Sequence, residues 1–144
     1  MAEGHEATTK ILRTAAGKIV IDITNPLAPD FMSLTVGHET SGAEAIARAL
    51  PETRVVKALN TIFASVLEDH ADGKTCTLPV FVAGDDPEAV SGVVELLRDM
   101  KLVAIPAGGL SNARYLEPMT EMMIQFAFGL GHGDRIGFTL SKAA

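Results

Sequence analysis

Short runs of β-branched residues alternate along this chain with segments that begin as helices do. The runs cover residues 18–23, 54–59, 78–83 and 102–105. Strands that alternate with helices form a mostly parallel sheet with helices on its faces. The sequence therefore predicts an α/β fold of about four strands and four helices, with residues 1–144 forming one domain.

Four segments have the pattern of helices: residues 8–16, 41–50, a segment from 86 through at least 97, and 111–128. A capping box of Ser41 and Glu44 begins the second, and Asp86 before a proline begins the third. Ser111 is the expected cap of the last helix. Pro118 within that helix predicts a kink or a new start there.

Composition excludes several classes of function. The net charge is −6 and the pI is about 5.1, without a basic stripe, which argues against a nucleic-acid partner. The longest apolar region, 116–130, contains Pro118, Glu121 and Gln125, so we expect no membrane span. The first ten residues lack the apolar centre of a signal peptide, and there is one cysteine, Cys76. We therefore expect a cytoplasmic protein.

No motif for metal binding or nucleophilic catalysis is present. The four histidines are scattered and form no ligand pair, so we expect no metal site. Catalytic residues stay unknown. Glu117 and Glu121 lie four residues apart, and we expect this like-charged pair on a solvated helix face.

Polar or small residues follow three of the strands, at Thr24-Asn25, at Asn60-Thr61 and in segment 107–112. Because the carboxyl ends of parallel strands meet at one edge of a sheet, we expect these three loops to lie together. Ligands bind at such edges in α/β proteins.

The third loop leads into the last helix and has two possible roles. The free N–H groups of a helix start, together with Arg114, can hold a carbonyl, a phosphate or a delocalised anion. The alternative is a structural role, with Ser111 as the helix cap and Arg114 paired with Glu117 at the surface.

Four segments together resemble a known family. They are IVIDITNPL at 19–27, SGAEAIARALPETRVVKALNTI at 41–62, FVAGDDPEAV at 81–90 and AGGLSNARYLEP at 107–118. In this order and spacing they resemble the coenzyme F-420-dependent NADP oxidoreductases, which transfer a hydride between a deazaflavin and NADP. The same Rossmann unit occurs in metalloreductases of the six-transmembrane type. The match runs from about residue 17 to residue 140.

This resemblance implies the C-terminal half of a Rossmann-like, doubly wound sheet. It also implies a small-molecule cofactor, coenzyme F-420 or another flavin. Six residues match cofactor-binding positions of the family: Asn60, Thr61, Ser111, Asn112, Arg114 and Thr120. Arg114 would orient the ring or support it electrostatically. Hydride transfer requires no protein nucleophile, since the cofactors carry the chemistry.

The glycine-rich half of the family is not found in these 144 residues. Family members begin with a strand, a glycine-rich turn and a helix that bind the NADP pyrophosphate, but the pattern G-x-G-x-x-G does not occur here. We therefore expect little NADP(H) binding and no hydride transfer by this chain alone. The alternative function is a non-catalytic ligand-binding or oligomerisation module derived from the same family.

The run 18–23 suggests how the chain associates. In a complete family member a strand of the other half would pair with it, and an unpaired apolar edge is normally covered or paired. We expect a homodimer, formed through this edge or through the Met and Phe side chains of segment 111–128. In the competing arrangement, residues 1–16 fold over the edge.

Overall fold

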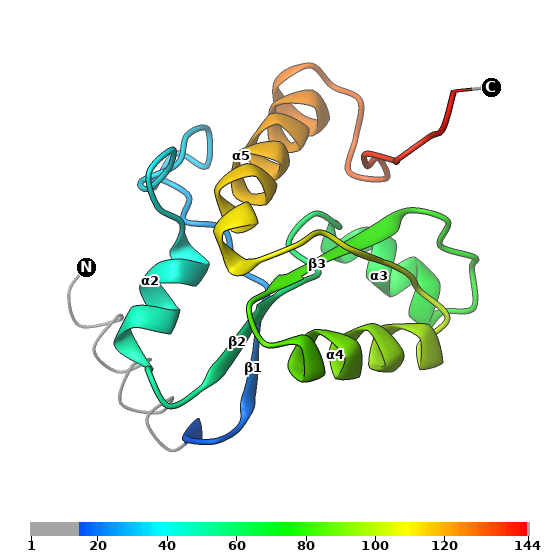
Figure 1. The fold of residues 1–144 in the computed structure, drawn as a ribbon. Helices are drawn as coiled ribbons and strands as arrows, with labels where there is room; N and C mark the ends of the chain where they lie inside the picture. The colour runs from blue at the N-terminus through cyan, green and yellow to red at the C-terminus, as the bar shows by residue number, and fades with distance from the viewer. Residues whose placement is uncertain (1–14, 144) are drawn as a thin grey trace.

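The four expected strands form one sheet. The structure, a computed structural model, describes residues 15–143, so most of the helix expected over 8–16 lies outside the described residues. The strands are β1 (Ile19–Asp22), β2 (Arg54–Lys57), β3 (Pro79–Gly84) and β4 (Val103–Pro106), in this order across the sheet (Figure 1). The α/β fold class is confirmed.

One pair of neighbouring strands is antiparallel. β1 pairs in parallel with β2 and β3 with β4, whereas β2 and β3 run in opposite directions through the pairs Val56–Gly84 and Lys57–Ala83. The sheet is mostly parallel, as expected. Residues 58–78 connect β2 to β3 and lie at one end of the sheet. Lys57, the last residue of β2, pairs with Ala83, and β3 begins at Pro79 on the side of this pair where β2 ends. The expectation that the loops after β1, β2 and β4 share one edge is therefore wrong, since β4 ends at the opposite edge.

Within residues 15–143, four α-helices pack around the sheet: α2 (Gly42–Ala49), α3 (Ala64–Ala71), α4 (Pro87–Asp99) and α5 (Ala113–Ile124). The expected starts of α2 and α4 are confirmed. Ser41 Oγ accepts the N–H of Glu44 at 3.2 Å, and Asp86 Oδ1 accepts the N–H of Ala89 at 2.7 Å. None of these helices is both long enough and apolar enough to cross a membrane.

The start of α5 differs from the prediction. A 3-10 turn over Leu110–Asn112 precedes the helix, so Ser111 lies inside the turn and does not cap α5. A new start at Pro118, one of the two expected outcomes, is wrong, because α5 continues through this residue. Buried neighbours on both sides, Leu116 and Thr120, hold the helix in place. A π-helical turn, Gln125–Gly129, ends the element.

Helix α3 was not predicted from the sequence. No side chain caps its start at Phe63, and none of its residues is fully buried. Its sequence, ASVLEDHA, therefore lacks both signals that indicate the other helices. It occupies the connection between β2 and β3.

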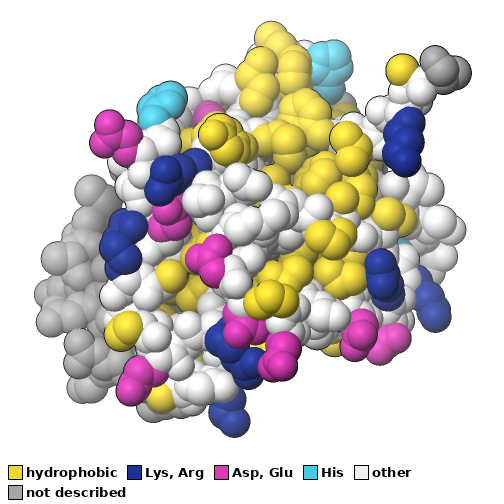
Figure 2. Space-filling model, in the orientation of Figure 1, with side chains coloured by type: hydrophobic (Ala, Val, Ile, Leu, Met, Phe, Trp, Pro, Cys, Tyr) yellow, Lys and Arg dark blue, Asp and Glu magenta, His cyan; other side chains and the backbone are white. Residues whose placement is uncertain are grey.

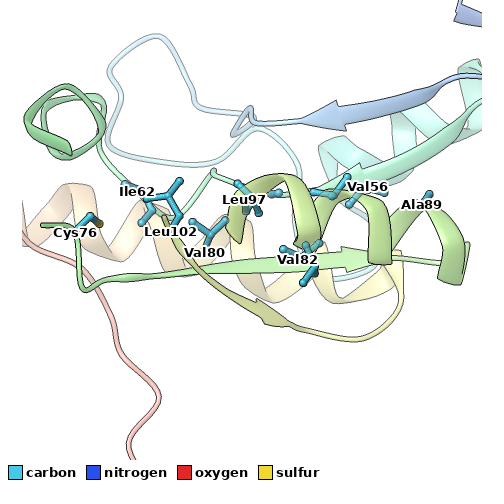
Figure 3. Packing of buried hydrophobic residues seen from close by; sticks show 11 residues of the cluster. Val56, Ile62, Cys76, Val80, Val82, Ala89, Leu97 and Leu102 are labelled. Atoms are coloured by element: carbon cyan, nitrogen blue, oxygen red, sulfur yellow. The ribbon is translucent and has the colours of Figure 1, made fainter. Parts of the chain in front are cut away.

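Different helices cover the two faces of the sheet. Successive strand residues point to opposite faces, so Val56 packs with α4 on one face and Val55 packs with α2 and the start of α5 on the other. Figure 3 shows the larger core, which includes Val56, Ile62, Cys76, Val80, Val82, Ala89, Leu97 and Leu102. Lys57 points to the same face as Val55, so its side chain lies between the sheet and the helices α2 and α5.

Candidate functional site

Buried polar side chains gather between the sheet and helices α2 and α5. They are Asp22, Ser41, Lys57, Asn60, Thr61, Glu117 and Thr120, each at most 4% exposed. Most of them belong to two rows that cross the β1, β2 and α5 segments in the same order. The ionic row is Asp22, Lys57 and Glu117; the amide row, three residues further along each segment, is Asn25, Asn60 and Thr120.

Lys57 holds the ionic row together. Its Nζ donates to Asp22 Oδ2 at 2.8 Å, to Glu117 Oε1 at 2.9 Å and to the carbonyl oxygen of Thr24. The three charged side chains are at most 1% exposed. Burying a charge costs several kcal/mol unless it is paired and hydrogen-bonded. Each charge in this row therefore depends on the others.

Glu117 also connects α5 with the start of α2. Its carboxylate accepts the N–H groups of Gly42 at 2.9 Å and Ala43 at 3.2 Å, which have no partner within α2. A Cβ added at Gly42 would lie 3.3 Å from Glu117 Oε1, so the glycine permits this approach. The expected solvated pair of Glu117 and Glu121 is wrong, because Lys57 and the helix start supply the compensation that a buried carboxylate requires.

Asn60 is the centre of the amide row. Its Nδ2 lies 3.0 Å from Asn25 Oδ1, 3.1 Å from the carbonyl oxygen of Leu116 and 3.2 Å from Thr120 Oγ1. Thr120 Oγ1 also lies 2.9 Å from the carbonyl oxygen of Asn60. The structure thus brings two of the six predicted site residues, Asn60 and Thr120, into direct contact.

Three buried polar atoms in or beside this row lack a partner. Asn60 Oδ1, Thr61 Oγ1 and Glu121 Oε2 form no hydrogen bond within the described part of the chain. A buried, unpaired polar group costs about 1–3 kcal/mol. Leu59, directly before Asn60, has a φ of 62°, a left-handed conformation that leucine seldom adopts. Unpaired groups and backbone strain of this kind concentrate at binding sites.

Ser111 and Asn112 lie between β4 and α5. Strand β4 ends at the edge of the sheet opposite to the edge at which β2 leads into Asn60 and Thr61. Asn112 Nδ2 donates to the carbonyl oxygen of Ala107 at 2.6 Å and so closes the turn. The Ser111 side chain is exposed. Among the described contacts, neither side chain is hydrogen-bonded to Asn60 or Thr61.

Arg114 is held by α2. Its Nε donates to Glu44 Oε2 at 2.8 Å and its Nη2 to Glu44 Oε1 at 2.6 Å. The surface pair with Glu117 considered from the sequence is therefore wrong. The hydrogen bonds from Arg114 are the main reason that the pKa of Glu44 lies below its ordinary value, and they raise the pKa of Arg114.

A separate charged cluster connects α3 with the C-terminal segment. Asp69 accepts from Arg135 Nε at 2.8 Å and from Lys74 Nζ at 2.7 Å, beside a cavity of about 290 Å³ that His70 and Cys76 also line. Hydrogen bonds from Arg135 and then Lys74 lower the pKa of Asp69 to about 2. In the described range, no group of three or more His, Cys, Asp or Glu residues is placed to hold a metal ion.

Sequence reasoning missed Lys57 and Glu117. The signal for Lys57 was available, because a lysine inside the β-branched run RVVKAL occupies a position where a strand residue is expected to be buried. A buried lysine requires a carboxylate partner. No local pattern identifies that partner, since Glu117 lies 60 positions away.

Comparisons with known proteins give relatives among the oxidoreductases. The chain is 34% identical over 113 residues to the F-420-dependent NADP reductase of Methanocaldococcus jannaschii, which covers 75% of this chain and 50% of that protein. It is 32% identical over 115 residues to metalloreductase STEAP3 of Rattus norvegicus, with coverage of 80% and 22%. No protein-family model matches the chain. The chain spans about half the length of the archaeal reductase.

A solved structure has the same fold. A protein from Arthrobacter sp., provisionally named an F-420-dependent NADP reductase, superposes with a TM-score of 0.85 at 31% identity. The match covers 98% of this chain and 65% of that one. This agrees with a chain that corresponds to the C-terminal portion of longer relatives.

Proposed function

We propose that this chain, which is similar to F-420-dependent NADP reductases in sequence and in fold, binds the ring of coenzyme F-420 or another flavin as part of an oxidoreductase. We propose that it does so as a single domain in the cytoplasm. The free thiol of buried Cys76 is in keeping with a reducing compartment.

The unpaired atoms Asn60 Oδ1 and Thr61 Oγ1 carry this proposal. Flavins and deazaflavins present an N–H donor and carbonyl acceptors along one edge of the ring. An amide oxygen and a hydroxyl have the complementary hydrogen-bonding groups. A ring edge placed there would supply the partners that these two atoms lack, and would offset their desolvation cost. The residues present therefore fit the ring.

The remaining candidate residues support the same ligand in different ways. Thr120 fixes the side chain of Asn60 through their contact. Arg114 uses Nε and Nη2 to bind Glu44, and no described hydrogen bond involves its Nη1, which stays available to a ring carbonyl or an anion. Ser111 and Asn112 would contact the ligand from the start of α5.

A bound deazaflavin or flavin supplies hydride chemistry, and the residues of this chain bind and orient it. The residues present do not fit a dinucleotide pyrophosphate, which requires a glycine-rich turn against a helix start. Gly108 and Gly109 lie between β4 and α5, but side chains fill the space beside them: a Cβ added there would lie 2.7 Å from Asn112 Nδ2 and 3.0 Å from Asp85 Oδ1, respectively. The glycine cluster at residues 129–133 follows a helix. We therefore assign NADP(H) no site on this chain.

Separate titrations with coenzyme F-420, FMN and NADPH test the proposal, with fluorescence as the signal. We expect F-420 or FMN to bind, and Asn60→Ala to weaken that binding about tenfold, because a buried hydrogen bond is lost. Thr35→Val is the matched control, since the Thr35 hydroxyl is exposed and bonded to Pro26. The proposal fails if neither ring compound binds the unmodified protein.

A second candidate function is a non-catalytic oligomerisation module, and an exposed apolar surface favours it. Figure 2 shows hydrophobic side chains gathered over α5 and the segment that follows it. Met122, Phe128 and Leu130 are 49%, 64% and 66% exposed. At the sheet edge, β1 pairs only with β2 among the described strands. Both features support a homodimer.

Light scattering during size exclusion tests the homodimer. We expect a mass near twice 15.2 kDa. Phe128→Ser should shift the protein towards monomer if α5 forms the interface, and Ile19→Lys should do so if the β1 edge forms it. A mass of 15.2 kDa over a wide concentration range excludes the dimer.

A further inference from the structure

The ionic row and the amide row have the same geometry but differ in how completely they are bonded. Each row takes its first member from the β1 segment, its second from the β2 segment and its third from α5. In each segment the two members lie three residues apart. The β1 segment, the β2 segment and α5 are therefore joined by two sets of hydrogen bonds, one between charged groups and one between neutral groups.

The ionic row is fully bonded. Asp22 Oδ1 accepts the N–H and the hydroxyl of Thr24 at 3.0 and 2.7 Å, while Oδ2 accepts from Lys57. Both oxygens of Glu117 have partners, as described above. No atom of this row is among the unpaired buried groups of the described residues. It therefore has no bonding capacity left for a ligand.

The amide row is left open at Asn60. The bonds from Asn60 Nδ2 to Asn25 of the β1 segment and to Leu116 and Thr120 of α5 together fix the plane of the side-chain amide. That plane sets the direction of Oδ1, the atom without a partner. Two of these three bonds are made to α5, so the direction of Oδ1 changes when α5 shifts or rotates about its axis.

Glu117 lies between Leu116 and Thr120 in the sequence, and its ion pair with Lys57 joins α5 to strand β2. Apolar packing alone is non-directional and tolerates small rotations and shifts. The short ion pair between Glu117 and Lys57 does not tolerate such shifts, because it is directional and Lys57 is itself bonded to Asp22 of the neighbouring strand. The ionic row thus sets the position of α5 on which the amide plane depends.

We propose that Lys57 is a positioning residue, which acts through Glu117 to aim Asn60 Oδ1 at the ligand. This rests on the proposed function in one respect: Asn60 Oδ1 accepts a hydrogen bond from the bound ring. Lys57 itself touches no ligand, because its three donors are already engaged by Asp22, Glu117 and Thr24.

The test replaces the whole ionic row with neutral groups of similar size. The triple variant Asp22→Asn, Lys57→Met, Glu117→Gln leaves no buried charge without a partner, and so avoids the large destabilisation that follows when one member of a buried ion pair is removed. Leu97→Ala is the control, because Leu97 packs in the core on the opposite face and leaves both rows intact. Urea unfolding gives the global stability of each variant.

The first readout requires no ligand. The side-chain amide hydrogens of Asn60, assigned by their loss in Asn60→Ala, should exchange with water at least tenfold faster in the triple variant. Those of Asn112, which is bonded to Ala107 at the other end of α5, should keep their protection. The proposal is overturned if the exchange rate of the Asn60 amide hydrogens is unchanged in the triple variant. It is also overturned if Asn60 and Asn112 lose protection equally, which is the result of a purely global loss of stability and the result that we expect for the Leu97→Ala control.

The second readout is titration with coenzyme F-420 and with FMN. We expect binding to the triple variant to be at least fivefold weaker than to the unmodified protein. Equal affinity overturns the positioning role. If the unmodified protein binds neither compound, the proposed function fails, and the amide exchange of Asn60 still decides the role of Lys57.

Discussion

Arg114 and Glu44 lie 70 positions apart in the chain and form an ion pair with two hydrogen bonds, of 2.8 and 2.6 Å, between α5 and α2. A few residues further along α5, Glu117 accepts two N–H groups at the start of α2. The two helices are therefore joined at two points. This is why Arg114 and Glu117, which a sequence pattern assigns to the surface, turn towards α2 and the sheet.

Glu44→Gln should make the protein less sensitive to acid. The pKa of Glu44 is lowered in the folded state, chiefly by its hydrogen bond from Arg114. The ion pair therefore contributes fully above the ordinary carboxyl pKa of 4.5, and its contribution is lost as the pH falls through the folded-state pKa. Urea unfolding at about pH 5 and about pH 3 should show a smaller loss of stability in the variant. Glu95→Gln, on the exposed side of α4, is the control and should behave as the unmodified protein does.

Asp69→Asn should release the C-terminal segment from α3. In the unmodified protein, NMR titration should place the pKa of Asp69 at about 2, below the ordinary 3.8. The contribution of this carboxylate is present above 3.8 and is lost as the pH falls through about 2. Trypsin should cleave after Arg135 faster in the variant, since the arginine loses its main partner. Unchanged cleavage relative to an Asp99→Asn control would contradict this.

Gly84→Ala should destabilise the protein by about 1–3 kcal/mol through overpacking. A Cβ there would lie 2.9 Å from Val90 Cγ2 and 3.3 Å from the carbonyl oxygen of Val55, where strand β3 meets both α4 and β2. Gly37→Ala is the matched control, since no atom lies within 4 Å of the added Cβ. Thermal unfolding of the two variants should separate them clearly, and equal melting temperatures would contradict the packing argument.

NADPH should bind this chain weakly or not at all, because the pattern G-x-G-x-x-G, which lets a backbone turn approach a pyrophosphate, does not occur in the sequence. Isothermal calorimetry is the measurement. A Kd in the low micromolar range, about −8 kcal/mol, would contradict the expectation. In that case the mass of the complex would show whether a dimer builds the missing site.

The features that sequence predicts best are those fixed by neighbouring residues. Ser41 caps α2 and Asp86 caps α4 as expected, because a capping bond joins residues three apart and leaves a local signature. The strands were found within one or two residues of their observed bounds for the same reason. Ser111 is the exception, since a 3-10 turn takes the place of the expected cap.

Features that depend on distant residues were not predicted. The direction of β3 relative to β2 leaves no mark in either strand, so the shared edge was expected in error. The burial of Glu117 depends on Lys57 and on the start of α2, 60 and 75 positions away. Asn60 and Thr120 were named through the family resemblance, and the structure brings them into contact.

The antiparallel junction between β2 and β3 has a consequence for folding. On either side of it, a parallel pair of strands and its connecting helix form one unit, β1–α2–β2 and β3–α4–β4. The backbone ladder that joins the units is short, and the side chains of α4 span it by packing on Val56 of one unit and on Val80 and Val82 of the other. Native-state hydrogen exchange should therefore resolve two cooperative units.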